Sequence, residues 1–137
     1  MTDEPTFADE RWVRIMADTA AEGVWDCRGT SGCADELPIP ADLVERLLRW
    51  QVWYDRSEAD EGGFDPAFDL DAFSAEGLAI AHAIKAALPD WTVLYFDEAR
   101  CQQARAARWD ERGVYRGEPP RLTFEYEITL PESTPVP

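Results

Sequence analysis

The residues of this sequence that are best suited to do chemistry are the carboxylates between positions 55 and 76. The chain has 28 Asp and Glu against 13 Lys and Arg, a formal net charge of −15 at pH 7. Residues 55–76 contain eight acids and one base, a net of −7. Such a field attracts a basic protein and speeds its association. We therefore expect the exposed acids of this segment to form a docking surface for a basic protein partner, the alternative being a solvated acidic loop. The residues expected to bind the partner are Glu58, Asp60, Glu61 and Asp65.

The same segment has the ligand type that calcium prefers, but the spacing is wrong. In an EF-hand loop, position three supplies a ligand and position six must be Gly. Counting from Asp65 as position one, these places are occupied by Ala67 and Leu70. We expect no calcium site here.

Three cysteines and one histidine are the other candidates for chemistry. Cys27 and Cys33 are separated by five residues and lack the paired two-residue spacing of common zinc modules. His82, the sole histidine, falls opposite the apolar face of its helix, where it is a poor base for a nucleophilic cysteine. The sequence therefore predicts free thiols at Cys27, Cys33 and Cys101, no metal, no cofactor and no catalytic residue.

A small enzyme remains the alternative function, with carboxylates in a pocket at a strand end. Asp97 and Glu98 follow an apolar run and are the most plausible acidic pair. Adjacent strand residues point to opposite faces, so their convergence is not expected. The sequence contains no Gly-rich phosphate loop, Ser-centred elbow or His-rich metal motif.

Six arginines lie together near the C-terminus, with Trp109 and Tyr115 among them. The acids between them make residues 99–137 neutral overall. Because the whole chain is strongly acidic, we expect no nucleic-acid binding. The arginines are expected to pair with the acidic part of the chain or to belong to an interface. They are Arg100, Arg105, Arg108, Arg112, Arg116 and Arg121.

The elements that position these residues follow from periodicity. Alternation predicts strands at 11–17 and 122–130, with a short strand at Val24–Trp25, and a continuous apolar run predicts a central strand at 91–96, buried on both faces. Apolar residues at helical spacing predict one helix after Pro40 and a second from about Asp69 to Leu88, and residues 98–109 favour a third. We expect an α+β fold in which an antiparallel or mixed sheet of three to five strands is packed on one face by two amphipathic helices.

A single domain is expected over residues 1–137, with 1–10 and 131–137 as loose tails. Its predicted core consists of Leu47, Trp50, Ile80, Ile84, Val93, Tyr95, Phe124 and Ile128. The acidic N-terminus, the lack of a long apolar segment and the odd number of cysteines favour a cytoplasmic location without membrane contact.

Several short patterns between residues 11 and 98 resemble small bacterial proteins of unassigned function. The resemblance implies a bacterial origin, and no activity or site residue follows from it. The matching patterns are Arg14 to Asp18, Gly23 to Asp26, Leu37 and Pro38, Leu47, Trp50 with Tyr54 and Asp55, Phe73 with Glu76 and Gly77, and Val93 with Tyr95.

Size, acidity, aromatic content and the lack of catalytic motifs favour a non-enzymatic interaction protein. The most concrete form of this hypothesis is an immunity- or antitoxin-like protein that covers a basic toxin with its acidic surface. A homo-oligomer is also compatible with the sequence.

Overall fold

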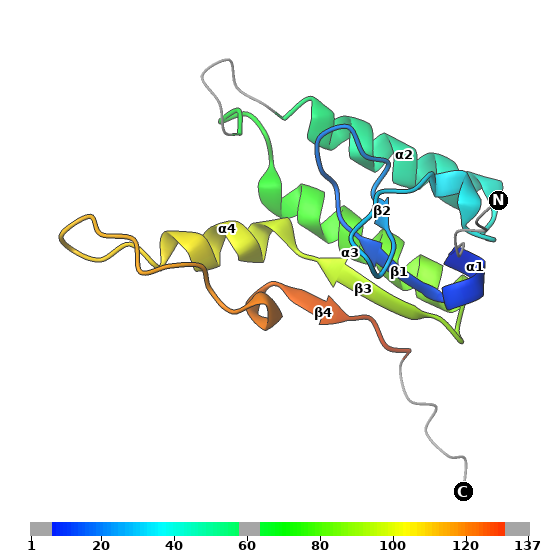
Figure 1. Cartoon of the computed structure of the whole chain (residues 1–137). Helices are drawn as coiled ribbons and strands as arrows, with labels where there is room; N and C mark the ends of the chain where they lie inside the picture. Colours follow the sequence, from blue (N-terminus) through cyan, green and yellow to red (C-terminus); the bar gives the residue numbers. More distant parts are fainter. Residues whose placement is uncertain (1–6, 58–63, 131–137) are drawn as a thin grey trace, which may run out of the picture.

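A four-stranded mixed sheet and four α-helices form the part of the chain that the structure describes, residues 7–57 and 64–130 of a computed structural model (Figure 1). The helices are α1 (Phe7–Glu10), α2 (Ala41–Asp55), α3 (Leu70–Ala87) and α4 (Glu98–Ala106). The strands are β1 (Trp12–Ile15), β2 (Val24–Trp25), β3 (Thr92–Phe96) and β4 (Glu125–Glu127). Two short 3-10 helices are η1 (Ala34–Glu36) and η2 (Arg121–Thr123).

The strands lie in the order β2-β1-β3-β4, with β1 and β3 parallel and both edge pairs antiparallel. Val13 lies opposite Val93 and Ile15 opposite Tyr95 in the parallel pair. Because side chains alternate along a strand, these four fully buried residues share one face. The other face of β3, expected to be buried as well, is half-buried.

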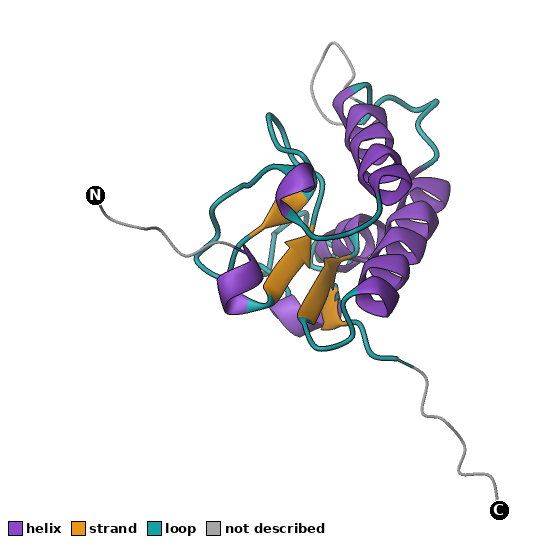
Figure 2. Cartoon of the chain, turned by 90° about the vertical axis from the view of Figure 1, so that its right-hand side faces the viewer, coloured by secondary structure: helices purple, strands orange, loops and turns teal. Residues whose placement is uncertain are grey.

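Helices α2 and α3 cover the buried face of the sheet (Figure 2). Helix α2 begins directly after Pro40, and α3 is capped by Asp69, whose carboxylate accepts a hydrogen bond from the Ala72 backbone N–H at 2.9 Å. The predicted α+β class, with a mixed sheet and two amphipathic helices on one face, is confirmed. The predicted helix after the central strand is also present as α4.

The centre of the core is a junction between α2, α3 and β3. The Trp50 ring stacks on Phe73 at 4.8 Å between centroids, and its indole N–H donates to the Phe73 carbonyl at 3.0 Å. The Tyr95 hydroxyl donates to the Ser74 carbonyl at 2.7 Å. Gly77 makes this approach possible, since an ideal Cβ there would lie 2.5 Å from both Trp50 and Tyr95.

Seven of the eight predicted core residues belong to this buried cluster, and Phe124 does not. Phe124 is buried, but its ring packs against Phe96, with centroids 5.2 Å apart. Phe96 lies on the face of β3 opposite Val93 and Tyr95. The alternation of the last strand therefore predicted the burial of Phe124 and assigned it to the wrong side of the sheet.

The predicted strand over residues 122–130 is wrong in its extent, because β4 includes only residues 125–127. A 3-10 turn follows Pro120 and leaves the Leu122 side chain 88% exposed. Glu125 is buried instead, in contact with Arg14 and Arg121. The buried Glu125 carboxylate thus has two arginine partners, of which Arg14 is mostly buried and Arg121 is half exposed.

The segment expected to be a loose tail over residues 1–10 ends in α1, where Phe7 is buried. Residues 131–137, the other expected tail, lie outside the described part of the chain. Among the helices that the structure describes, none is long and apolar enough to cross a bilayer.

Candidate partner-binding surface

The predicted docking residues lie at the connection between α2 and α3. Glu58, Asp60 and Glu61 fall outside the described residues. Asp65 is exposed and organises the turn that leads into α3. Its carboxylate accepts from the Ala67 backbone N–H, and its carbonyl accepts from Phe68, both at 2.8 Å. Its own N–H donates to the Ser57 carbonyl at 2.6 Å, which fixes the turn against the end of α2.

Further carboxylates gather around Asp65 from the adjoining helix ends. Asp55 is the last residue of α2, Asp69 caps α3, and Asp71 lies in the first turn of α3. All three are exposed. Negative charge is favourable at the N-terminal end of a helix, which explains why Asp69 and Asp71 are tolerated there.

A buried glutamine adds a carboxylate from a distant part of the sequence. The Gln51 side chain is 3% exposed and donates to the Asp18 carbonyl at 2.8 Å and to the Asp55 carboxylate at 2.9 Å. Its carbonyl oxygen accepts from the Asp18 N–H at 3.3 Å. These bonds hold the turn after β1 beside the end of α2.

Five carboxylates thus lie at one end of the molecule, and we call them the acidic end: Asp18, Asp55, Asp65, Asp69 and Asp71. Within residues 7–57 and 64–130, none of the five forms a salt bridge. Sequence reasoning missed Asp18, because only the contacts of Gln51 place it there.

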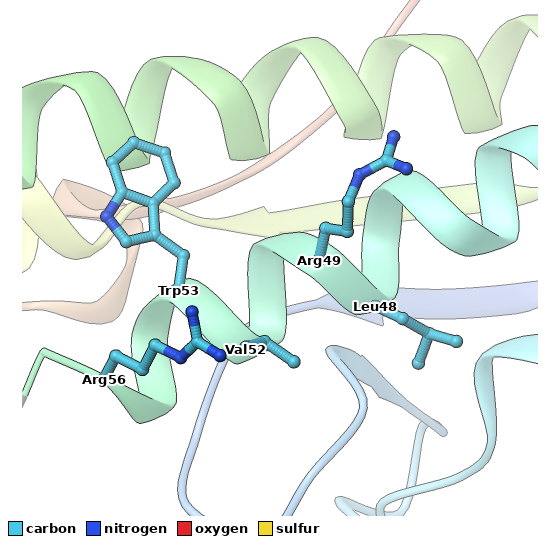
Figure 3. Close-up of a pocket in the computed structure, with 5 residues that line it drawn as sticks. All are labelled: Leu48, Arg49, Val52, Trp53 and Arg56. Carbon is cyan, nitrogen blue, oxygen red and sulfur yellow. The ribbon is translucent and has the colours of Figure 1, made fainter.

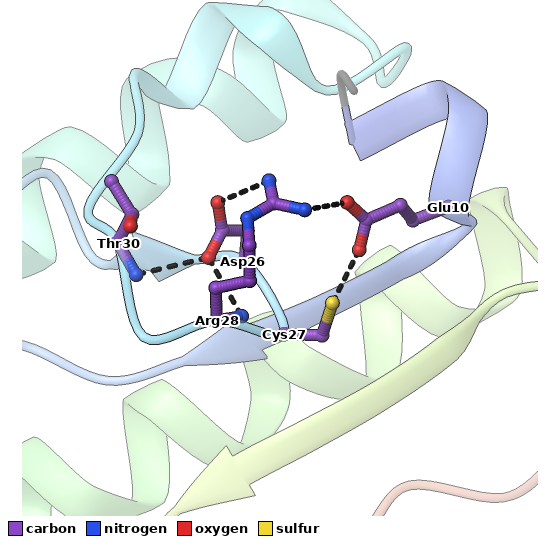
Figure 4. Close-up of polar contacts among 5 residues, drawn as sticks. All are labelled: Glu10, Asp26, Cys27, Arg28 and Thr30. Atoms are coloured by element: carbon purple, nitrogen blue, oxygen red, sulfur yellow. Dashed lines mark hydrogen bonds and ion pairs between the residues drawn. The ribbon is translucent and has the colours of Figure 1, made fainter. Parts of the chain in front are cut away.

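Some acids outside the acidic end are paired with arginine. Glu76 receives two hydrogen bonds from Arg46, at 3.0 and 2.7 Å, and these bonds lower the pKa of its carboxyl. Arg28 pairs with both Glu10 and Asp26 beside β2, the latter at 2.8 Å (Figure 4). Glu76 was part of the acidic segment by sequence, yet its pairing removes it from the surface available to a basic partner.

The surroundings of each cysteine raise the pKa of its thiol. The Cys27 thiol donates a hydrogen bond to Glu10, which raises the pKa of the thiol (Figure 4). The charge of Glu22 raises the pKa of Cys33, and burial raises that of Cys101. His82 is exposed, as predicted.

All three thiols are free. In the part of the chain that the structure describes, no three His, Cys, Asp or Glu side chains are placed to hold a metal ion.

The carboxylates of Asp97 and Glu98 engage separate groups. Asp97 caps α4 by accepting from the Arg100 N–H at 3.1 Å, and it accepts from the Tyr126 hydroxyl at the same distance. Glu98 accepts from Gln102 at 3.0 Å, and burial raises the pKa of its carboxyl, with Asp18 adding to the rise. The convergent pair that an acid–base enzyme would use is therefore not formed by these two residues.

A shallow apolar groove runs along the outer side of α2 next to the acidic end (Figure 3). Leu48, Val52 and Trp53 supply its apolar lining, and Arg49 and Arg56 flank it. Val52 is 42% exposed, whereas the Trp53 ring packs edge-on against Phe73. Among the residues that the structure describes, no carboxylate lines this groove.

The C-terminal arginines pair mainly within their own segment. Arg105 contacts Glu118 at 3.1 Å and Arg116 contacts Asp110 at 3.3 Å. Within residues 7–57 and 64–130, Arg100 is the one C-terminal arginine that pairs with an acid before residue 99, namely Asp97 at 3.6 Å. The expected pairing with the acidic part of the chain is thus limited, and the acidic end is left without these counter-charges.

Comparison with known proteins places this arrangement in a family. No curated protein matches the chain. The model of a family described as Serratia CdiI immunity protein-like matches residues 11–98, which is more than half of the 137 residues. The match spans β1, β2, β3, α2 and α3, and with them the whole acidic end. The chain therefore belongs to the Serratia CdiI immunity protein-like family.

Proposed function

We propose that this immunity-type protein binds a basic toxin through its acidic end. The observation that supports the proposal is the gathering of five acids at one end of the molecule, none of which forms a salt bridge with a described residue. Acids without a salt bridge to described residues also lie at the opposite end, and the control below uses four of them. Unpaired charges gathered at one end produce the directional field that steers a partner of opposite sign.

Glu58, Asp60 and Glu61 belong to the proposed surface by sequence, since they lie between two of its members. Counted by sequence, the proposed surface would then include eight carboxylates. We also propose that the protein acts in the bacterial cytoplasm, where the three free thiols would stay reduced.

The test replaces four residues of the acidic end by asparagine: Asp18, Asp55, Asp65 and Asp69. Asparagine keeps the side-chain oxygen that accepts the bonds at Asp55, Asp65 and Asp69, so each turn and cap is retained while the charge is removed. The binding probe is the product of the gene immediately upstream of the gene for this chain, which the proposal expects to be a toxin domain. We expect the association rate at low salt to fall by about tenfold or more, within the range known for steering.

A matched control removes the same charge at the opposite end of the molecule, where α2 and β3 begin (Figure 1). The control changes Asp35, Asp42 and Asp90 to asparagine and Glu45 to glutamine, all of them exposed. We expect it to slow association much less than the acidic-end variant does. Equal slowing by both variants would show that net charge alone acts, and would refute the acidic end as the docking surface.

Salt and a third variant complete the test. The difference between the two variants should shrink as the Debye length falls from about 30 Å at 0.01 M to about 8 Å at 0.15 M. Neutralising Glu58, Asp60 and Glu61 together, with Asp65 unchanged, should slow association in the same direction. An unchanged rate in that variant would limit the docking surface to the residues of the acidic end.

A further inference from the structure

Residues 108–117 form an extension that the family match does not include, since the match ends at residue 98. This extension, which we call the arm, follows α4 and projects away from the sheet (Figure 1). Its two sides meet in an antiparallel bridge between Trp109 and Tyr115.

The arm is held by its own hydrogen bonds rather than by the core. The Arg108 guanidinium donates to the carbonyls of Gly117 and Arg116, at 2.9 and 2.8 Å. The Asp110 carboxylate accepts from the backbone N–H groups of Arg112 and Val114, at 2.9 and 3.0 Å. An ordered loop loses little conformational entropy when it binds, which favours affinity.

This ordered loop presents apolar side chains to solvent. Trp109 is 57% exposed and Val114 is 55% exposed. The Trp109 ring contacts Tyr115, with centroids 5.0 Å apart, and neither residue belongs to the core cluster. The arm holds an exposed tryptophan in a fixed place without burying it. Its Trp, Tyr and Arg residues are the types that predominate among the anchor residues of protein interfaces.

The polar part of the arm indicates the charge of what it contacts. Arg108, Arg112 and Arg116 line a hollow together with Asp110 and Val114. Arg108 and Arg116 are engaged within the arm, but the Arg112 guanidinium forms no hydrogen bond or ion pair with a described residue. The hollow therefore offers a free cation beside an exposed aliphatic side chain, which suits a carboxylate next to an apolar group.

We propose that the arm is a second contact with the toxin, in which a toxin carboxylate enters the arginine-lined hollow and apolar toxin side chains cover Trp109. This inference rests on the proposed function, because the partner is the same. The acidic end would steer the toxin, and the arm would hold it once bound. Steering acts on the association rate, whereas the loss of a buried anchor acts on the dissociation rate.

The experiment measures association and dissociation rates for the same upstream-encoded toxin domain. Trp109→Ala should raise the dissociation rate by roughly 30-fold, the factor expected for a hot-spot residue, and leave the association rate nearly unchanged. Arg112→Gln and Val114→Ser should act in the same direction while leaving the contact of Trp109 with Tyr115 intact. Leu122→Ser is the matched control, since Leu122 is 88% exposed but lies outside the arm.

The outcomes separate the two proposals. If the asparagine variant of the acidic end slows association while the three arm variants dissociate like the wild type, the arm proposal is refuted and the proposed function stands. If the wild type does not bind the toxin domain, both are refuted. A third outcome is that the wild type is a dimer, that Trp109→Ala makes it a monomer and that toxin binding is unchanged. The arm would then contact a second copy of this chain, and the proposal would be refuted.

Discussion

Substituting Gly77 by alanine should destabilise the protein, although alanine is the better helix former. Gly77 lies within α3, where the change would normally stabilise by about 1 kcal/mol. Here an ideal Cβ would lie 2.5 Å from the Trp50 ring and 2.5 Å from the Tyr95 hydroxyl. Both side chains are almost fully buried, so neither can move aside freely.

The expected magnitude follows from these contacts. Overpacking costs about 1–3 kcal/mol, and weakening the bonds from Trp50 and Tyr95 to the Phe73 and Ser74 carbonyls of α3 adds about 1 kcal/mol each. After the gain of about 1 kcal/mol in helix propensity, we expect a net loss of about 2–4 kcal/mol. For a chain of this size that corresponds to a fall in the melting temperature of roughly 7–14 °C.

Denaturant unfolding followed by tryptophan fluorescence would measure the change. Ala75→Gly, at an exposed position of the same helix, is the control for propensity and should cost about 1 kcal/mol. In a Tyr95→Phe background, Gly77→Ala should cost less, because the hydroxyl that meets the new methyl group is gone. A Gly77→Ala protein as stable as the wild type would refute the close approach at this junction.

Two further predictions concern pH and metals. Hydrogen bonds from Arg46 lower the pKa of Glu76 below its usual 4.5, so the stability from this pair is present above that pH and is lost as the pH falls through the folded-state pKa. Glu76→Gln should therefore cost about 0.2–1 kcal/mol at pH 7 and progressively less as the pH falls through the folded-state pKa, as followed by denaturant midpoints. A cost that does not change with pH would argue against the ion pair. Calcium or zinc at micromolar concentration should leave the melting temperature unchanged, whereas tight binding at 100 times the dissociation constant would add about 2.7 kcal/mol.

Local sequence signals predicted most of the helices and strands of the fold. Pro40 and the apolar spacing of Leu43, Leu47 and Trp50 predicted α2, because each of these effects operates within one helix. Asp69 predicted the start of α3 for the same reason. Signals of this kind need no knowledge of distant parts of the chain.

The errors arose where a distant residue decides burial. Glu125 is buried because Arg14, 111 positions earlier in the chain, contacts its carboxylate. Alternation of residue types does not reveal that pair, so the last strand was predicted too long and Phe124 was assigned to the wrong side of the sheet. Asp18 likewise reaches the acidic end through Gln51, 33 positions later.

Four of the residues that support the bacterial resemblance are explained by packing. Trp50, Phe73, Gly77 and Tyr95 form the junction of α2, α3 and β3. A junction buried to this degree cannot touch a partner. These residues therefore determine how α2, α3 and β3 pack, and not which toxin is bound. Partner choice must depend on exposed groups elsewhere.

The exposed groups that remain have opposite signs, and this restricts the partner. The acidic end is negative, whereas the arm offers the free Arg112 guanidinium beside Trp109. A toxin with a uniformly positive surface would be attracted to the first and repelled by the second. Both contacts form together only on a toxin that has a basic face and, apart from it, a carboxylate next to apolar side chains. Discrimination against other basic proteins would then come from the arm, because an unmatched Arg112 and Trp109 penalise every partner that lacks this second site.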